Sequence, residues 1–342
     1  MSHRAMTNPP DLLPCTIVIE WENAIDVEDE WAARAVAGLE RELENTAPQM
    51  RARPVITYLF NKDAVDGEII RRTIMNAAPK LFENARVELV PTSGLTYYEL
   101  KNFGASRAQT EVSIFLDSDA APQPGWLRNM LEPFNSPDVM AVGGITVLAA
   151  VDFFSRALAL IWIFGLFDER HETAARWGIY ANNTAVRTEF FKSRPFPKLN
   201  AYKYSCVFWL RGILADNHRY VRVADAVTVH APHPSYRFFL WRAWITGLDR
   251  DFYVSHTHQS SRLGRVGRAF GFFFSRTVRA WWRILTKRKS VRLPLWQVPG
   301  AMAVALAYSV SLLAGQVWSA VSRRQEGKID LKPSADPTIA AS

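Results

Sequence analysis

One stretch, EVSIFLDSDAAPQPGWL at residues 111–127, constrains the fold more than any other part of the chain. Its apolar run, Val112 to Leu116, predicts a buried strand. The run ends abruptly in Asp117-Ser118-Asp119, followed by two prolines and a glycine. Open α/β sheets bind ligands at the carboxyl ends of their strands, where two carboxylates one residue apart can hold Mg²⁺ or Mn²⁺. A solvated turn is the alternative interpretation of an isolated Asp-x-Asp.

Segments with strand and helix character alternate along the first 150 residues. Strands are predicted by β-branched and apolar runs at residues 15–19, 54–60, 86–90, 112–116 and 140–147. Helices are predicted by apolar spacing at residues 25–45, 66–82, 97–108 and 126–134. This alternation indicates an α/β fold with a mostly parallel sheet.

Composition excludes several classes of protein. A chain of 342 residues with 49% hydrophobic content can bury one substantial core and an appendage. Cys15 and Cys206 are the only cysteines and lie far apart, so neither a disulfide framework nor a zinc site is indicated. No Gly-rich phosphate loop of the Walker or dinucleotide type is present. The first 14 residues lack the apolar segment of a signal peptide, which predicts a cytosolic location for the region after them.

The segment KNFGASRAQTEVSIFLDSDAAPQPGWL, residues 101–127, resembles the central segment of family 2 glycosyltransferases. There an Asn/Ala/Arg-rich helix leads into a strand, an Asp-x-Asp and then Pro-x-Pro-Gly-Trp-Leu. The resemblance extends more weakly over residues 15–236. It implies the GT-A nucleotide-diphospho-sugar transferase fold, which is Rossmann-like, and a nucleotide-diphosphate sugar as donor. It also implies a divalent metal, Mn²⁺ or Mg²⁺, held by Asp117 and Asp119.

Further positions match the family's donor site and metal site. The resemblance implies donor contacts from polar residues around the strand ends: Glu22, Asn23, Lys101, Asn102, Arg107, Asp117, Asn182 and Asn183. His230, at the end of a predicted strand pair, is a candidate third metal ligand. Other interpretations remain for several of them, since Asn23 suits a helix N-cap, Asn182 and Asn183 suit a turn, and a lone histidine is usually structural. Leu59-Phe60-Asn61-Lys62 stands where the family tends to carry an Asp for the nucleobase, so the nucleotide is left open.

The expected catalytic base is missing. Inverting members of the family usually carry an Asp at the start of the helix after the acceptor loop, where Ser205 and Cys206 stand here. No carboxylate occurs between Phe190 and Ala215. The base comes from elsewhere, the reaction retains configuration, or the protein is inactive. We predict that the base is one of three carboxylates following the apolar stretch 153–167, with solvated surface residues as the alternative: Asp168, Glu169 and Glu172.

The C-terminal third is basic. No Asp or Glu occurs from Phe252 to Gln325, whereas twelve Lys and Arg do, so the remainder of the chain is mildly acidic. Residues 235–253 and 266–285 place aromatic residues and arginines at helical spacing, which predicts basic amphipathic helices on anionic lipid. Packing on the catalytic domain is the alternative for these helices. Nucleic acid is the competing partner for the charge, and we predict that the protein does not bind it.

Residues 293–322 carry no charge and are long enough to cross a hydrocarbon core of about 30 Å. The basic flank at 287–292 predicts that the catalytic domain faces the cytosol at the cell inner membrane. Residues 153–167 are too short to span and predict a buried helix near an acceptor channel, or a surface helix dipping into lipid. The expected divisions are an extension (1–13), a GT-A domain (14–236), membrane-interface helices (237–292), a transmembrane or membrane-inserted helix (293–322) and a disordered tail (323–342).

The resemblance implies a glycosyltransferase, and the C-terminal pattern predicts that it is attached to a membrane. It would move a sugar from a nucleotide-diphosphate sugar to a saccharide or lipid-linked acceptor, in polysaccharide biosynthesis, with a metal stabilising the leaving diphosphate. The alternative is a degenerate transferase that binds a nucleotide sugar or a glycan without turnover.

Overall fold

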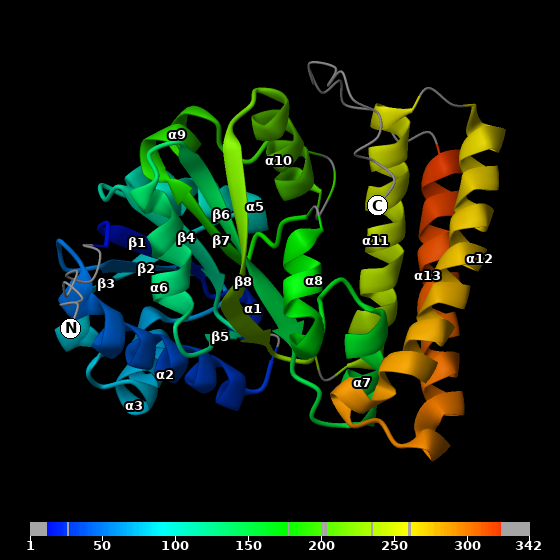
Figure 1. Ribbon diagram of the computed structural model, residues 1–342, viewed down its shortest axis with the longest axis horizontal. Helices are drawn as coiled ribbons and strands as arrows, with labels where there is room; N and C mark the ends of the chain where they lie inside the picture. Colours follow the sequence, from blue (N-terminus) through cyan, green and yellow to red (C-terminus); the bar gives the residue numbers. More distant parts are fainter. Residues whose placement is uncertain are drawn as a thin grey trace, which may run out of the picture.

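The computed structural model describes residues 12–322, apart from positions 26, 177, 200, 202, 203, 234, 259 and 260. Most of the expected N-terminal extension and the whole expected tail, 323–342, lie outside the described residues. A central sheet has helices on both faces, and a separate layer of long helices stands at one side of it (Figure 1).

Within the described residues, eight strands form one sheet in the order β3-β2-β1-β4-β7-β6-β8-β5. They are β1 (Cys15–Glu20), β2 (Val55–Asn61), β3 (Arg86–Thr92), β4 (Val112–Asp117), β5 (Ala120–Pro122), β6 (Val139–Leu148), β7 (Asn183–Arg187) and β8 (Arg219–His230). The first four are parallel, whereas β7 is antiparallel to both its neighbours. β8 runs parallel to β6, and β5 runs antiparallel to β8. The sheet is therefore mixed, and the predicted parallel arrangement holds for its first half.

Side-chain alternation along the strands builds a core on each face of the sheet. Ile17 and Ile19 of β1 pack with one core, and Val18 between them packs with the other. The first core is covered by α2 (Asp29–Thr46), α3 (Gly67–Ala77) and α6 (Trp126–Leu131). The second is covered by α5 (Tyr97–Arg107), α9 (Thr188–Ser193) and α10 (Ser205–Ala215). Short α1 (Glu22–Ile25) follows β1 directly.

Local sequence explains two helix ends. The single helix expected at 66–82 is two helices, α3 and α4 (Leu81–Asn84), because Ala78 precedes a proline and leaves the helical conformation. α5 begins after Thr96, whose backbone N–H and hydroxyl both donate to the Glu99 carboxylate. This capping box fixes the start of the helix that carries Lys101.

The helical layer consists of α11 (Tyr236–Thr257), α12 (Arg262–Lys287) and α13 (Val298–Val321) standing side by side (Figure 1). Helix α7 (Phe153–Ile161) packs against α12 and α13 and is buried in their shared core. Gly247 of α11 and Gly315 of α13 mark the closest approach, because a Cβ at either position would overlap a backbone carbonyl of the other helix. The apolar stretch expected to be helical over 153–167 leaves the helix after Ile161. Helix α8 (Arg170–Ala175) comes after that stretch.

In the described part of the chain, the segment Leu295–Val321 is the one helix long and apolar enough to cross a membrane. It does not stand alone, since α11 and α12 pack along it and Arg265 of α12 contacts both Asp251 and the carbonyl of Ser319. On the outside of α12, large apolar side chains are exposed at helical spacing. This apolar stripe of α12 consists of Leu263, Phe270, Phe274, Val278, Trp282 and Leu285.

Candidate active site

Strand register brings together residues that are distant in the sequence. Glu20 ends β1 and pairs in register with Asp117, which ends the neighbouring parallel strand β4. On the other side, Ala120 of β5 pairs with His230 of β8, and the Ala231 N–H donates to the Asp119 carbonyl at 2.9 Å. Two separate ladders therefore place Asp117, Asp119 and His230 at one edge of the sheet.

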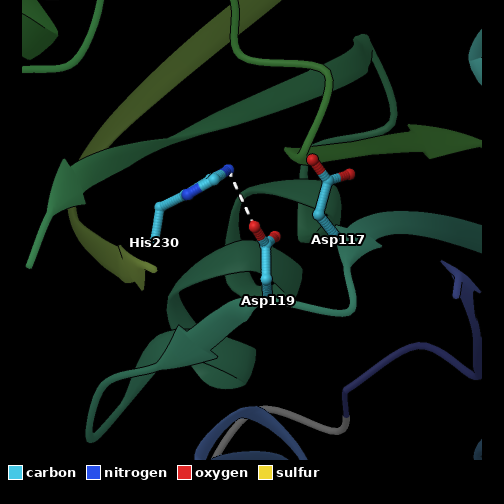
Figure 2. Close-up of side chains that lie close together, drawn as sticks. All are labelled: Asp117, Asp119 and His230. Carbon is cyan, nitrogen blue, oxygen red and sulfur yellow. Dashed lines mark ion pairs between the residues drawn. The ribbon is translucent and has the colours of Figure 1, made fainter. Parts of the chain in front are cut away.

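These three side chains form a cluster with metal-binding geometry. One ligand atom from each of Asp117, Asp119 and His230 lies within 4.8 Å of the others. His230 Nε2 lies 3.4 Å from Asp119 Oδ2, as Figure 2 shows. His230 Nδ1 is 2.7 Å from the Ala231 carbonyl oxygen, which can only accept a hydrogen bond. Nδ1 therefore carries a proton, and Nε2 is the ring nitrogen that faces the cluster.

Asp119 shows why a cation fits this site. The residue is buried, and its Oδ1 atom has no hydrogen-bond partner among the described residues. Burial raises the pKa of Asp119 to about 6; His230 opposes the rise and the nearby Asp117 adds to it. A divalent cation would partner the orphaned oxygen and offset this clustered negative charge. Two carboxylates and one imidazole are ligands that suit Mn²⁺ or Mg²⁺.

The side chains of Lys101 and Tyr97 fix the orientation of the Asp117 carboxylate. Its Oδ1 atom lies 2.7 Å from Lys101 Nζ and accepts a hydrogen bond from the Tyr97 hydroxyl at 2.9 Å. Lys101 has no exposed surface, so its charge is paired with Asp117 and not with solvent. Glu20 lies beside them, and burial together with the charge of Asp117 raises the pKa of Glu20 well above its ordinary range. Asn23 donates to the Glu20 carboxylate through its backbone and its side chain.

A cavity of about 370 Å³ opens from the cluster. Asp117, Asp119 and His230 line one part of it, and side chains of α11 line another. Trp162 and Phe164, which follow α7, form an aromatic wall beside His230. The cavity therefore links the sheet edge to the helical layer.

The structure distributes the sequence-predicted donor residues over several environments. Asn23 and Asn182 line the same cavity as Asp117, whereas Glu22 and Asn102 line an adjacent cavity of about 270 Å³. Arg107 is exposed at the end of α5. Asn183 is fully buried, where it donates to the Ile145 and Ala226 carbonyls and accepts from Trp126 Nε1, so it joins three strands.

The three carboxylates expected to include the base lie outside this cavity. Asp168 accepts a hydrogen bond from Ser290, and Glu169 makes ion pairs with Arg283 and Lys287 of the helical layer. Glu172 is exposed. The expectation of a base among them stays a prediction that this placement does not support. The chain lines the cavity at Trp162 and Phe164 and has left it by Asp168. Among the described lining residues, the carboxylates are those of Asp117 and Asp119.

Sequence reasoning missed several residues of this site. Glu20 is the last residue of a buried strand, and a carboxylate at such a position is itself a sequence signal of a functional site, because acidic residues are rarely buried. The cavity side of α11 presents Phe238, Arg242, Thr246 and Arg250 at intervals of four residues. That spacing was present in the sequence, but the side of α11 that faces the sheet domain depends on tertiary packing.

The mixed α/β sheet, with a cavity at the carboxyl end of a central strand, has the GT-A fold. Residues 72–198 match the family described as glycosyl transferase family 2. The match covers 127 of the 342 residues, and the chain is a glycosyltransferase.

One solved structure shares this fold, and two others are more distant. Mannosyltransferase PcManGT from Pyrobaculum calidifontis, solved in complex with GDP-Man and Mn²⁺, is 15% identical with a TM-score of 0.55, over 91% of this chain and 89% of that one. A mycobacterial protein is more distant, with 15% identity and a TM-score of 0.42 over 69% of this chain and 73% of that one. GalNAc-T7 with UDP, GalNAc and Mn²⁺ is also more distant, with 11% identity and a TM-score of 0.40 over 71% of this chain and 50% of that one. No curated protein matches the chain.

Proposed function

We propose that this protein transfers a sugar from a nucleotide-diphosphate sugar to a hydroxyl group of a saccharide or lipid-linked acceptor, with a divalent metal at Asp117, Asp119 and His230. The observation that carries the proposal is the clustering of these three residues in the lining of the cavity. The solved mannosyltransferase with GDP-Man and Mn²⁺ shares the fold and supports a donor of this class.

The residues of the cluster have different tasks in this mechanism. Asp119 and His230 offer an unpartnered oxygen and a nitrogen lone pair as ligands, whereas Asp117 is oriented by Lys101 and Tyr97. A bound cation would stabilise the charge that develops on the leaving diphosphate. In the transfer, the bond between the sugar C1 and the diphosphate oxygen breaks. A bond from C1 to the acceptor oxygen forms, and the acceptor proton leaves to a base.

The protein's membrane attachment is the second part of the proposal. The apolar stripe of α12 and the exposed apolar side chains of α13 would insert into the membrane interface, with the arginines of α12 beside lipid phosphates. The basic flank at 287–292 favours the cytosolic face of the inner membrane. An acceptor bearing a lipid would then reach the cavity from the helical layer.

The experiment that tests this function is a thermal-shift screen of nucleoside diphosphates with and without Mn²⁺. A ligand that binds only the folded protein raises its stability by mass action, by about 2.7 kcal/mol at one hundred times its Kd. We expect one nucleotide to raise Tm only when Mn²⁺ is present. No shift with any nucleotide would contradict the proposal.

A binding protein without turnover is a second candidate, and Ser205 and Cys206 favour it. They begin α10 where inverting relatives would carry an Asp, and burial raises the pKa of the Cys206 thiol to about 11, so it stays protonated. Binding of the donor without any product would support this candidate. Formation of product would exclude it, and the anomeric configuration of that product would then show whether a base is needed.

A further inference from the structure

The cavity continues along α11, away from the metal cluster. Phe238, Arg242, Thr246, Arg250 and Tyr253 line it at intervals of four and three residues, so they form one stripe of the helix. Eight residues separate Arg242 from Arg250, which corresponds to about 12 Å of helix rise. A molecule that fills the cavity would therefore reach from the metal cluster to Arg250, well beyond the space that a leaving diphosphate needs.

Arg250 is a partly buried cation that lacks an anionic partner among the described residues. Its guanidinium lies 3.4 Å from the Phe272 ring centroid and contacts Tyr204, but its Nε atom is buried with no hydrogen-bond partner there. Within the described chain, no carboxylate lies at ion-pair distance from it. Burial, together with the nearby positive charges of Arg276 and Arg279, lowers the pKa of Arg250.

Arg276 extends the positive charge on the neighbouring helix. Its guanidinium donates to the Ile161 carbonyl at 2.7 Å and stacks over the Tyr308 ring at 4.8 Å. Its Nε atom is also buried and without a partner in the part of the chain that the structure describes. Buried charges are normally paired, so two adjacent, partly satisfied guanidinium groups indicate an anion that is bound in the working protein.

The position of Arg250 also defines the shape of its ligand. Besides the main cavity, Arg250 lines a second, open cavity of about 510 Å³ between α11 and α12, together with Phe272 and Arg268. An anion at Arg250 would thus have the metal cluster on one side and the surface of the helical layer on the other. A molecule with a hydroxyl group at one end, an anionic group in the middle and an apolar tail would match this arrangement.

We propose that Arg250, with Arg276 behind it, binds the phosphate group of a phosphate-bearing amphiphilic acceptor. This inference rests on the proposed function, because it places the acceptor hydroxyl at the metal cluster. A guanidinium matches phosphate with two parallel hydrogen bonds, and the negative charge of the phosphate would offset part of the positive charge of the two arginines. Arg250 is thus the residue that selects an acceptor carrying phosphate over an uncharged one.

The test measures binding of decyl phosphate, inorganic phosphate and decyl maltoside to the full chain by isothermal titration. The variants are Arg250→Gln, Arg250→Lys and, as a matched control, Arg262→Gln, which removes an exposed charge from the same basic layer. Thermal unfolding of each variant shows that it is folded. Inorganic phosphate distinguishes a site for the free anion from a site for a lipid head group, and decyl maltoside reports nonspecific binding of the tail.

We expect decyl phosphate to bind the wild type and Arg262→Gln equally, and Arg250→Gln about tenfold or more weakly, the scale of a charge-assisted hydrogen bond. The affinity of Arg250→Lys for decyl phosphate should fall between those of the wild type and Arg250→Gln. Inorganic phosphate should bind more weakly than decyl phosphate, and decyl maltoside should not distinguish the variants. Equal binding of decyl phosphate by Arg250→Gln and Arg262→Gln would overturn the proposal, as would inorganic phosphate binding as tightly as decyl phosphate.

Donor binding separates this inference from the proposed function. Mn²⁺-dependent nucleotide binding should be unchanged in Arg250→Gln, and a loss there would assign Arg250 to the donor and overturn the inference. Conversely, Asp119→Asn should bind decyl phosphate normally. If the wild type binds no nucleotide but binds decyl phosphate through Arg250, the proposed function fails and the phosphate site stands.

Discussion

Lys101 Nζ lies 2.7 Å from Asp117 Oδ1, and both side chains are buried. The Asp-x-Asp therefore does not present two equivalent carboxylates. Asp117 is oriented by Lys101 and Tyr97, whereas Asp119 keeps an oxygen without a partner among the described residues and lies next to His230. This asymmetry predicts that substitutions at the two positions have different effects. A change at Asp117 breaks the buried pair with Lys101, whereas a change at Asp119 removes a candidate metal ligand.

The buried pair should make Lys101 essential for stability. Lys101→Met leaves the buried Asp117 beside Glu20 without its lysine partner, and breaking a buried pair in this way costs about 3–5 kcal/mol of the free energy of unfolding. Urea unfolding measures the change. The matched control is Lys192→Met, which removes a lysine paired with the exposed Glu189 and should cost less than about 1 kcal/mol. Equal costs in the two variants would mean that the buried pair has no special role.

The contact between α11 and α13 should be sensitive to one added methyl group. Gly247→Ala or Gly315→Ala would push a Cβ into the backbone of the facing helix, and overpacking of this kind costs about 1–3 kcal/mol. Gly267→Ala is the control, since nothing lies within 4 Å of its added Cβ and alanine favours a helix by up to about 1 kcal/mol. A stabilising effect at Gly247 would show that the two helices do not pack as described.

Membrane attachment should depend on the apolar stripe of α12. Val278→Glu and Trp282→Glu each place a charge on the exposed face, so we expect neither to float with vesicles of anionic lipid at low salt. Ile69→Glu is the control, because it changes an exposed apolar residue on α3, away from the helical layer (Figure 1). Flotation of the two α12 variants at the wild-type level would contradict attachment through this face.

Much of the sheet domain was predictable, because its signals are local. Buried runs such as Val112 to Leu116 and helix starts such as Thr96 specify their own elements. The resemblance implied Asp117 and Asp119 as metal ligands and His230 as a candidate third one, and the structure brings these three side chains together. The direction of β7 was not predictable from the sequence, since the apolar pattern of a short buried strand is the same in either direction.

The helical layer and the base show where local reasoning fails. An uncharged segment such as Val298–Val321 has the same composition whether it spans a membrane alone or packs beside α11 and α12. Asp168 and Glu169 follow an apolar stretch that reaches the cavity at Trp162 and Phe164, but nothing in that stretch indicates that the chain leaves the cavity before the two carboxylates. Ion pairs with distant residues such as Arg283 become visible only in three dimensions.

The placement of the three acidic residues gives a prediction opposite to the one drawn from the sequence. Asp168→Asn, Glu169→Gln and Glu172→Gln should each transfer sugar at close to the wild-type rate, because none of them lines the cavity. Glu169→Gln should lower Tm slightly through its lost pairs with Arg283 and Lys287. Transfer rates and donor binding are measured for each variant. A loss of about a hundredfold in one variant with normal donor binding would restore that residue as the base.

The central claim is that Asp119 binds a metal that in turn holds the donor. Its most direct test is calorimetric titration of wild type, Asp119→Asn and Asp63→Asn with Mn²⁺ and the nucleoside diphosphate that gives the largest Mn²⁺-dependent thermal shift. Asp63→Asn removes an exposed carboxylate and serves as the control. Losing a direct ligand should exceed the roughly 10- to 100-fold scale of an outer partner, so we predict binding by Asp119→Asn about a hundredfold weaker or more, with Asp63→Asn unchanged. Equal Mn²⁺-dependent affinity in all three proteins would contradict the account.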